Sequence, residues 1–385
     1  MSDPGPAVTP IRRIAIAAAC LLAAALVGCD RKPDPPPVVS RPPAEEKVLN
    51  VLNWSDYIGP DTVAQFEAET GIKVHYDVFD SNEVLETKLL TGRTGYDVVV
   101  PSDFFLERQA KVGVLLPLDK SKLPHFANLD PAVLRLLDGA DPGNRFGVPY
   151  AGVVTGIGYN VAKVRKALGA AQVDSWAIVL DPKYASKFKD CGLTMLDGEA
   201  EVFSSAKLAL GKDSNSEDRD VLDAAEALLA KVRPYVRYFN SSQYINDLAN
   251  GETCIAIAWS GDVLQSRDRA REAGKDVEIA FAVPKEGALL GWDMLAIPAD
   301  APHPDNAHKF IDFLLRAEVA ANFTKFRKFP SGNLAAEKLV PAELRADPLI
   351  YPPADVLERL KPHRAESIVY ARYANRAWTR VRTGR

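Results

Sequence analysis

Three tryptophans of this sequence, directly after or inside an apolar run, are each followed within three residues by an aspartate. In chain order the pairs are Trp54 with Asp56, Trp259 with Asp262, and Trp292 with Asp293. Carboxylates neutralise ammonium groups, while aromatic ring faces cover methylene groups and attract cations by about 0.5–2 kcal/mol each. Aspartates far apart in the sequence would hold two charged ends and so set a ligand length. The pattern indicates a site for a molecule that carries ammonium groups on an aliphatic stem.

Each of these residues also has a purely structural interpretation. Asp262 precedes a predicted helix and could be its N-cap, and Asp293 could be a turn residue before the apolar stretch that begins at Leu295. Tryptophans are often half-buried structural residues. What favours a site is the joint placement of these residues, which chance produces less readily than any one of them.

No motif of an enzyme active site or cofactor site accompanies the aromatic–acid pairs. The sequence lacks Gly-x-Ser-x-Gly, His-Glu-x-x-His, Cys-x-x-Cys and Gly-x-x-x-x-Gly-Lys, and its five histidines include no pair at metal-ligand spacing. Gly156-Ile157-Gly158 is only a fragment of a dinucleotide-binding motif. We therefore predict a protein that is not an enzyme, with no catalytic residues, no metal and no cofactor.

The elements that must position the aromatic–acid pairs alternate between strand and helix patterns. The predicted elements are strands at 48–53, 72–78 and 96–101, and helices at 60–71 and 81–92. This order indicates a parallel, doubly wound sheet, in which ligands bind at the carboxyl ends of the strands. Polar turns fall at those ends, at residues 54–56, 80–82 and 101–103.

A second unit with the same pattern runs from about residue 155 to 284. Its strand at 255–259 again ends in a polar turn, Ser260-Gly261-Asp262, before a helix. The chain then returns near residues 287–298 and finishes with helical segments. Two α/β lobes joined by more than one crossover would form a cleft, with strand-end turns of both lobes facing it.

Length and charge limit the fold and the partners. A chain of 385 residues is long enough for about two domains, and 47% hydrophobic with 25% charged residues is an ordinary globular composition. The formal net charge of -4 argues against nucleic acid and anionic lipid as partners.

The N-terminus has the pattern of an export signal. Arg12 and Arg13 precede an apolar run at residues 14–28, which is short for a membrane span. Leu26-Val27-Gly28-Cys29 resembles the bacterial lipobox, in which the cysteine is lipidated, and Asp30 resembles the signal that retains lipoproteins in the inner membrane. The alternative is a plain signal peptide. A proline-rich tether follows as far as residue 46.

Two cysteines, Cys191 and Cys254, remain when the signal and Cys29 are set aside. Exported proteins fold in an oxidising compartment, so a disulfide is the leading interpretation. Two buried free thiols are the alternative.

The sequence resembles the periplasmic putrescine-binding proteins of polyamine ABC importers over nearly all of the mature chain. The matching runs are NWSDYIGPDTVAQFEAETGIKVHYDVFDSNEVLETKLLTGRTGYDVVVPS, FLERQ, PLDKSKLP, TGIGYN, RYFNSSQYINDLANG, CIAIAWSGD and IYPPADV. The resemblance implies a two-lobed α/β periplasmic-binding-protein fold of the type II kind, each lobe a doubly wound, mainly parallel sheet. It also implies a monomer that closes over putrescine or a related polyamine and delivers it to an ABC permease.

By the same resemblance, Asp262 and Asp293 would each hold one ammonium end, aromatic rings would wall the methylene chain, and serines would accept hydrogen bonds. The family's disulfide would match Cys191–Cys254. The predicted ligand-binding residues are Trp54, Ser55, Asp56, Tyr57, Ser102, Glu201, Trp259, Asp262, Asp293 and Phe329.

Three positions depart from the putrescine-binding pattern. Gly291 stands where these proteins carry a cage aromatic, and Trp292 beside it would point to the other side of a strand. Phe329 replaces a tyrosine. Phe104 stands at a position where putrescine binders have a small residue and binders of longer polyamines have a bulky ring. The departures leave the preferred polyamine open.

The sequence thus predicts an extracytoplasmic polyamine-binding protein held at the inner membrane by a lipid anchor. One alternative is a sensory binding protein without a transport role; another is an exported hydrolase of cationic amides that uses Asp56 and Asp262 as an acid/base pair. The predicted segments are a signal peptide at 1–29, a tether at 30–46, lobe 1 at 47–153, lobe 2 at 154–286, a return to lobe 1 at 287–345 and a C-terminal helical segment at 346–385.

Overall fold

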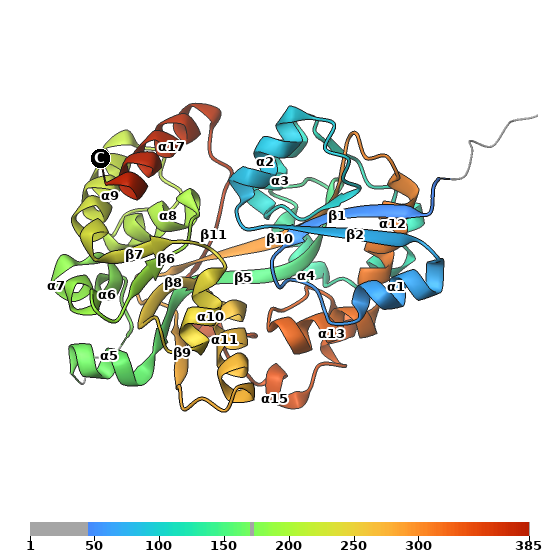
Figure 1. Cartoon of the computed structure of the whole chain (residues 1–385). Coiled ribbons are helices and arrows are strands. Elements are labelled where there is room, and N and C mark those ends of the chain that lie inside the picture. Colours follow the sequence, from blue (N-terminus) through green and yellow to red (C-terminus); the bar gives the residue numbers. More distant parts are fainter. Residues whose placement is uncertain (1–44, 170–172, 385) are drawn as a thin grey trace, which may run out of the picture. The chain divides into compact units, whose positions relative to one another are not determined.

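The structure is a computed structural model that describes residues 45–169 and 173–384 (Figure 1). The predicted signal peptide, the lipidation site at Cys29 and the tether up to residue 44 lie outside the described residues. Glu45–Arg385 forms one compact unit.

The first part of this unit has the predicted order of strands and helices. Its elements are β1 (Val48–Trp54), α1 (Thr62–Thr70), β2 (Lys73–Phe79), α2 (Asn82–Thr91), β3 (Val98–Val99), α3 (Asp103–Lys111), β4 (Leu115–Leu116) and α4 (Pro131–Leu137). β1 pairs in parallel with both β2 and β3. Gly71 ends α1 in a left-handed conformation, and the Ser81 hydroxyl caps α2 by accepting from the backbone N–H of Val84. The parallel, doubly wound order is confirmed here.

The middle of the chain forms a second set of elements at the opposite end of the same sheet. These are β5 (Gly147–Asn160), α5 (Val161–Leu168), α6 (Ala177–Leu180), α7 (Pro182–Ala185), β6 (Leu193–Met195), α8 (Glu199–Ala209), α9 (Arg219–Val232), β7 (Val236–Phe239), α10 (Gln243–Ala249), β8 (Ile255–Trp259), α11 (Ser260–Glu272) and β9 (Ile279–Ala282). The remaining elements are β10 (Ala288–Pro298), α12 (Pro304–Leu314), α13 (Ala317–Arg327), α14 (Leu334–Glu337), α15 (Ala342–Arg345), α16 (Ala354–Leu357), β11 (Leu360–Pro362) and α17 (Ile368–Thr383).

Two long strands connect the halves. β5 and β10 pair antiparallel from Thr155 opposite Leu289 to Gly147 opposite Ala296, and the sheet runs in the order β2-β1-β3-β10-β5-β8-β6-β7 (Figure 1). Their antiparallel direction makes the whole sheet mixed, although β6 pairs in parallel with both β7 and β8.

Two hydrophobic cores lie along this sheet. The first core contains buried residues from the ranges 49–151 and 292–329, and the second core contains residues from 154–288 and 360–381. We call the parts of the molecule around them lobe 1 and lobe 2. Tyr370, Ala374, Ala377 and Trp378 bury one face of α17 in the second core, so the C-terminal helix packs on lobe 2.

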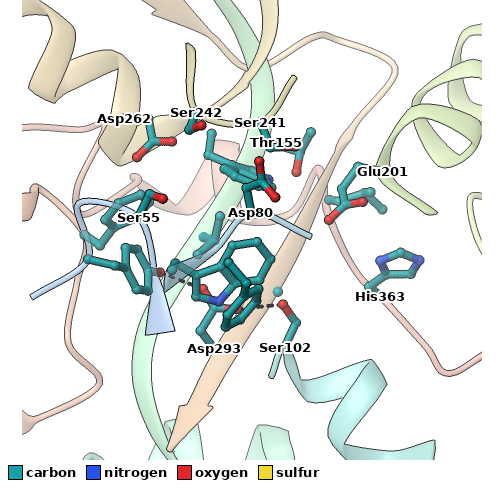
Figure 2. A pocket seen from close by; sticks show the side chains of 18 of the residues that line it. Ser55, Asp80, Ser102, Thr155, Glu201, Ser241, Ser242, Asp262, Asp293 and His363 are labelled. Atoms are coloured by element: carbon teal, nitrogen blue, oxygen red, sulfur yellow. Dashed lines mark hydrogen bonds between the residues drawn. The ribbon is translucent and has the colours of Figure 1, made fainter. Parts of the chain in front are cut away.

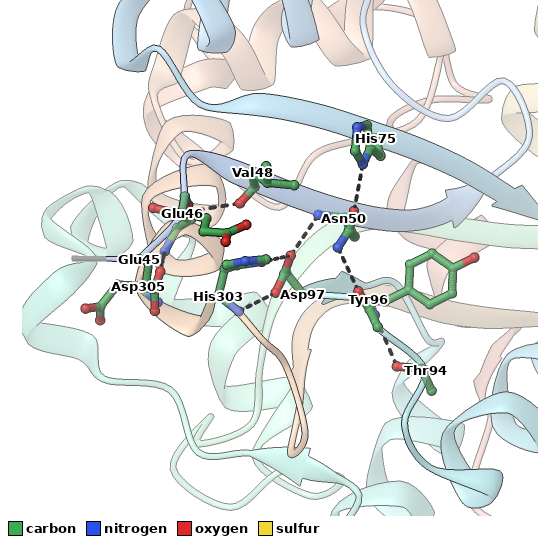
Figure 3. A network of polar contacts seen from close by, with 12 residues as sticks. Glu45, Glu46, Val48, Asn50, His75, Thr94, Tyr96, Asp97, His303 and Asp305 are labelled. Carbon is green, nitrogen blue, oxygen red and sulfur yellow. Dashed lines mark hydrogen bonds and ion pairs between the residues drawn. The ribbon is translucent and has the colours of Figure 1, made fainter. Parts of the chain in front are cut away.

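A polar network fixes the start of the sheet in lobe 1 (Figure 3). The fully buried Asp97 accepts hydrogen bonds from the backbone N–H of Asn50 at 2.8 Å and of His303 at 2.6 Å. It thereby ties β1 to the segment before α12, and both oxygens of the Asp97 carboxylate have donors within the lobe.

One local expectation is wrong. Ser260-Gly261-Asp262 is not a turn but the first turn of α11, whose N-cap is Trp259. Within this turn Gly261 packs directly against the ring of Phe329, where a Cβ atom would collide with it. Asp262 is therefore inside the helix and is not its N-cap. No helix in the described ranges combines the length and apolar character needed to cross a membrane.

Candidate functional site

A cavity lies between the two lobes, at the carboxyl ends of β1, β3 and β8 and against the middle of β10 (Figure 2). Its empty volume is about 670 Å³. Its lining residues are Trp54, Ser55, Tyr57, Phe79, Asp80, Ser102, Phe104, Val153, Thr155, Glu201, Ser241, Ser242, Ile245, Trp259, Asp262, Leu289, Gly291, Asp293, Phe329 and His363.

Asp293 lies on β10 and lines the cavity, where side chains of lobe 1 hold its carboxylate by hydrogen bonds. The Tyr57 hydroxyl donates to its Oδ2 at 2.7 Å. The Ser102 hydroxyl donates to its Oδ1 at 2.6 Å (Figure 2). Asn82 completes this support, because it donates to the Ser102 hydroxyl at 3.0 Å and accepts from the Ser102 backbone N–H at 3.0 Å. The Asp293 carboxylate is thus fixed in position before a ligand arrives.

Asp262 is the corresponding carboxylate in lobe 2. The buried Tyr244 hydroxyl donates to its Oδ2 at 2.7 Å, and Gln265 donates to its Oδ1 at 3.2 Å. Tyr244 in turn accepts from the backbone N–H of Trp259 at 3.2 Å, which links the acid to the end of β8. The first turn of α11 carries Asp262, so the strand-to-helix junction itself points the acid into the cavity.

Aromatic rings wall the space between the two acids. Trp54 and Trp259 meet edge to face with ring centroids 5.5 Å apart, although one ends a strand of lobe 1 and the other a strand of lobe 2. The Trp54 indole N–H donates to the Val100 carbonyl at 2.9 Å, which fixes the orientation of its ring. Tyr57 packs against Phe329 with centroids 5.0 Å apart.

The other end of the cavity is formed by Glu201, Phe104 and His363. Glu201 lies in the first turn of α8, where Gly198 leaves room for its carboxylate. His363 stacks on the Phe104 ring with centroids 3.9 Å apart. Burial lowers the pKa of His363 to about 3, so its imidazole is neutral at ordinary pH.

Acids are the charged side chains that line the cavity. Within the described part of the chain, no lysine or arginine lines it. Burial raises the pKa of Asp293 to about 6, against the hydrogen bonds from Ser102 and Tyr57 that lower it, and burial raises that of Asp262 to about 7 and of Glu201 to about 8. A bound cation would stabilise the ionised form of these buried carboxyl groups.

Alternation along β10 decides which residues face the cavity. Leu289, Gly291 and Asp293 line it, whereas Leu290 and Trp292 line a separate cavity on the other face of the strand. Trp292 therefore does not take the place of an aromatic at Gly291. A Cβ at Gly291 would meet only the Asp103 carboxylate, at 3.7 Å, so this part of the wall is open space.

The structure brings together most of the predicted residues and sets one apart. Asp56 does not line the cavity; its carboxylate is 3.0 Å from Arg269 Nη2 and 3.8 Å from Arg327 Nη1. Asp56 adopts a left-handed conformation with φ of 54° in the turn that follows β1. The residues that do line the cavity are Trp54, Ser55, Tyr57, Ser102, Glu201, Trp259, Asp262, Asp293 and Phe329.

Several lining or supporting residues had no signal in the sequence. Thr155 lies in the middle of β5, Ser241 and Ser242 precede α10, and His363 follows β11. Tyr244 sits in an amphipathic helix and reads as an ordinary core residue. Only the folded chain shows that these residues meet at the cavity.

Comparison with known proteins agrees with this architecture. Residues 61–352 match the family described as bacterial extracellular solute-binding protein. The chain belongs to this family.

Relatives of this solute-binding protein are similar over most of their length. It is 53% identical to the putrescine-binding periplasmic protein PotF of Escherichia coli K12 over 344 residues, 89% of this chain and 93% of that protein. It is 48% identical over 343 residues to the putrescine-binding periplasmic protein SpuD of Pseudomonas aeruginosa UCBPP-PA14, covering 89% and 94% of the two chains. Among solved structures, the substrate-binding protein PotD of a spermidine/putrescine ABC transporter from Streptococcus pneumoniae is 28% identical, with a TM-score of 0.69 over 88% of this chain and 99% of that one.

Proposed function

We propose that this solute-binding protein is the polyamine-binding component of an ABC importer and that it binds putrescine or a related polyamine in the cavity between its lobes. The observation that carries the proposal is the pair of hydrogen-bonded carboxylates, Asp262 and Asp293, held on different elements of an aromatic cavity without a lining lysine or arginine in the described residues. The relatives named for putrescine and spermidine support the same ligand class.

Ligand binding would favour the closed arrangement of the lobes. Asp262 belongs to lobe 2, whereas Tyr57 and Ser102, which hold Asp293, belong to lobe 1. A ligand with two ammonium groups reaches both acids only when the lobes approach, so its contacts differ between the open and closed states. β5 and β10 are the connections about which such a movement would take place.

The remaining roles follow from the same proposal. The protein acts as a monomer in the periplasm, is anchored to the inner membrane through lipidated Cys29, and hands its ligand to a permease. The motif Leu26-Val27-Gly28-Cys29 and the proline-rich residues after it support the anchor. A Cys29→Ser change removes the thiol that would carry the lipid, so loss of lipid attachment with an unchanged folded body is the expected outcome.

Titration calorimetry tests the ligand. The soluble body from Lys47 onward, unfolded and refolded to remove carried-over ligand, is titrated with putrescine, cadaverine, agmatine, spermidine and spermine. Dissociation constants of micromolar or below for one or more of these amines are expected. Absence of heat from the whole panel would overturn the proposal, and turnover of an acylated polyamine would instead favour the hydrolase.

A further inference from the structure

A second cavity lies directly behind Phe104, on the side of its ring away from the Asp262–Asp293 site. We call it the glutamate chamber. Its empty volume is about 540 Å³, and it lies between α2 and α3 of lobe 1 and α8 and α17 of lobe 2. The charged residues that line it are Glu83, Glu86, Arg108, Glu199 and Glu366.

The chamber has more negative than positive groups. Arg108 donates two hydrogen bonds of 2.7 Å to Glu86 and also lowers the pKa of Glu366 and Glu83, but it is one cation among four glutamates. The charges of Glu83, Glu199 and Glu366 have no such partner among the residues that line the chamber. The buried Lys207 lowers the pKa of Glu199 and Glu366 through its charge, but its ammonium donates its hydrogen bonds to the carbonyls of Ser214 and Ser216.

One of these carboxylates is buried with an empty acceptor. Glu199 is only 4% exposed, and its Oε1 has no hydrogen-bond partner in residues 45–169 or 173–384. A buried carboxylate oxygen without a donor is costly, since its loss of hydration is not replaced. Burial, followed by the neighbouring Glu366 and Glu83, raises the pKa of Glu199, and Lys207 offsets this only in part.

The chamber and the Asp262–Asp293 site share a wall one side chain thick. Phe104 lines both, and it packs with Phe105 and Ala200 in a small cluster between α3 and α8. Glu199 and Glu201 flank Ala200 on α8, so one carboxylate faces the chamber and the other faces the first cavity. A rotation of the Phe104 side chain would connect the two spaces.

We propose that the glutamate chamber is a further ammonium site, filled by the outer end of a polyamine with three or more ammonium groups whose other groups lie between Asp262 and Asp293. The inference rests on the proposed function and specifies its ligand class. An alkylammonium group donates three hydrogen bonds from one tetrahedral nitrogen and so suits carboxylates that approach from different helices. No set of three or more metal-ligating side chains is arranged around one point in the described residues, which favours an organic cation here.

Calorimetry with spermidine and putrescine tests this inference on the soluble body. Glu199→Gln removes the charge without changing the side-chain volume, and it should weaken spermidine binding at least tenfold while putrescine binding changes by less than twofold. Glu343→Gln, an exposed glutamate outside both cavities, is the matched control and should change neither. Thermal melts verify that each variant is folded.

Two further variants keep the inference falsifiable if Glu199→Gln does not fold. Glu366→Gln, at a half-exposed position, should have the same selective effect. Phe104→Ala should raise the affinity for spermidine relative to putrescine, because it removes the shared wall. Equal losses for both amines, or no loss for spermidine, would overturn the ammonium site while leaving the proposed function in place. Failure of the wild-type protein to bind either amine would overturn the proposed function and this inference together.

Discussion

Asp293 shows how a single carboxylate is prepared for a cation. It is only 6% exposed, yet two hydroxyl donors from lobe 1 hold both of its oxygens. Those donors fix the orientation of the carboxylate but supply no full positive charge. A bound ammonium group is therefore the expected counter-charge for the Asp293 carboxylate, which is already held in a fixed orientation.

Replacing Asp293 by Asn should weaken putrescine binding by about 100-fold or more. Removing one partner of a buried ion pair costs about 3–5 kcal/mol, because the remaining charge stays buried and unpaired. Titration calorimetry gives the change, and Asp276→Asn, at an exposed site outside the cavity, is the control. An Asp293→Asn protein that is folded and binds putrescine like the wild type would remove Asp293 from the site.

The affinity for putrescine should rise with pH. The pKa values of about 6 for Asp293, 7 for Asp262 and 8 for Glu201 mean that these groups lose their protons between about pH 5.5 and 8.5. A dication requires the ionised forms, so the dissociation constant should fall across this interval. Calorimetry in a series of buffers measures it, and a flat profile would show that these acids do not hold the ligand.

The ligand-free protein should have the opposite dependence. These carboxyl groups have higher pKa values in the folded chain than the usual values of about 4 in an unfolded one, so the folded state binds more protons. The contribution of these carboxyl groups to the free energy of unfolding is therefore greatest below about pH 4. It is lost as the pH rises through their folded-state pKa values of about 6 to 8. Melting temperatures with and without putrescine should thus diverge as pH increases.

At the scale of elements, the β5–β10 pair separates two differently lined spaces. Thr155, Gly291 and Asp293 face the site, while Val154 and Trp292 face the cavity behind it. The period of two along a strand explains why an aromatic shifted by one residue cannot replace a cage aromatic. Gly291 therefore leaves extra room beside the ligand.

Lobe 2 contains a second constraint of this scale, the disulfide Cys191–Cys254, which joins the segments before β6 and β8 across a separation of 63 residues. Replacing both cysteines by serine should lower the free energy of unfolding by about 4 kcal/mol in the chain-entropy model. Urea denaturation of the soluble body measures the difference. Putrescine binding under native conditions should persist, because neither cysteine lines the cavity; equal urea midpoints would show that the bond does not stabilise the lobe.

At the scale of the whole molecule, ion pairs join the lobes beside the cavity. Asp56 of lobe 1 pairs with Arg269 of α11, and Lys328 pairs with Asp268 of α11 at 2.9 Å. These charges lie outside the aromatic cavity, and the Asp56 side chain is 43% exposed. These ion pairs stabilise the relative position of the lobes, and dissolved salt screens their attraction.

Asp56→Asn should weaken putrescine binding by about two- to fivefold at low salt, the range measured for exposed ion pairs. The difference from wild type should shrink at 0.5 M NaCl. Glu69→Gln, which breaks the Glu69–Arg316 pair within lobe 1, should leave the affinity unchanged. A loss of 100-fold, independent of salt, would instead mean that Asp56 contacts the ligand directly.

The local pattern was sufficient for much of the fold. The period-two and helical patterns from Val48 to Val100, with Gly71 and Gly92 as helix ends, predicted β1 to β3 and the helices between them. Aromatic and polar residues at the strand ends, among them Trp54, Ser102 and Trp259, located the site, because the carboxyl edge of a parallel sheet is fixed by strand order. The cysteine count indicated the disulfide that the structure contains.

What the sequence determined by itself was therefore the order of the elements and the kind of chemistry at their ends. The tertiary structure decided which side chains meet. Asp56 turns to Arg269 instead of the cavity, Tyr244 orients Asp262, and His363 arrives from the C-terminal part of the chain to stack on Phe104. Local patterns reflect backbone periodicity and burial, whereas such contacts join residues far apart in the chain and depend on how the lobes pack, which no short stretch of sequence encodes.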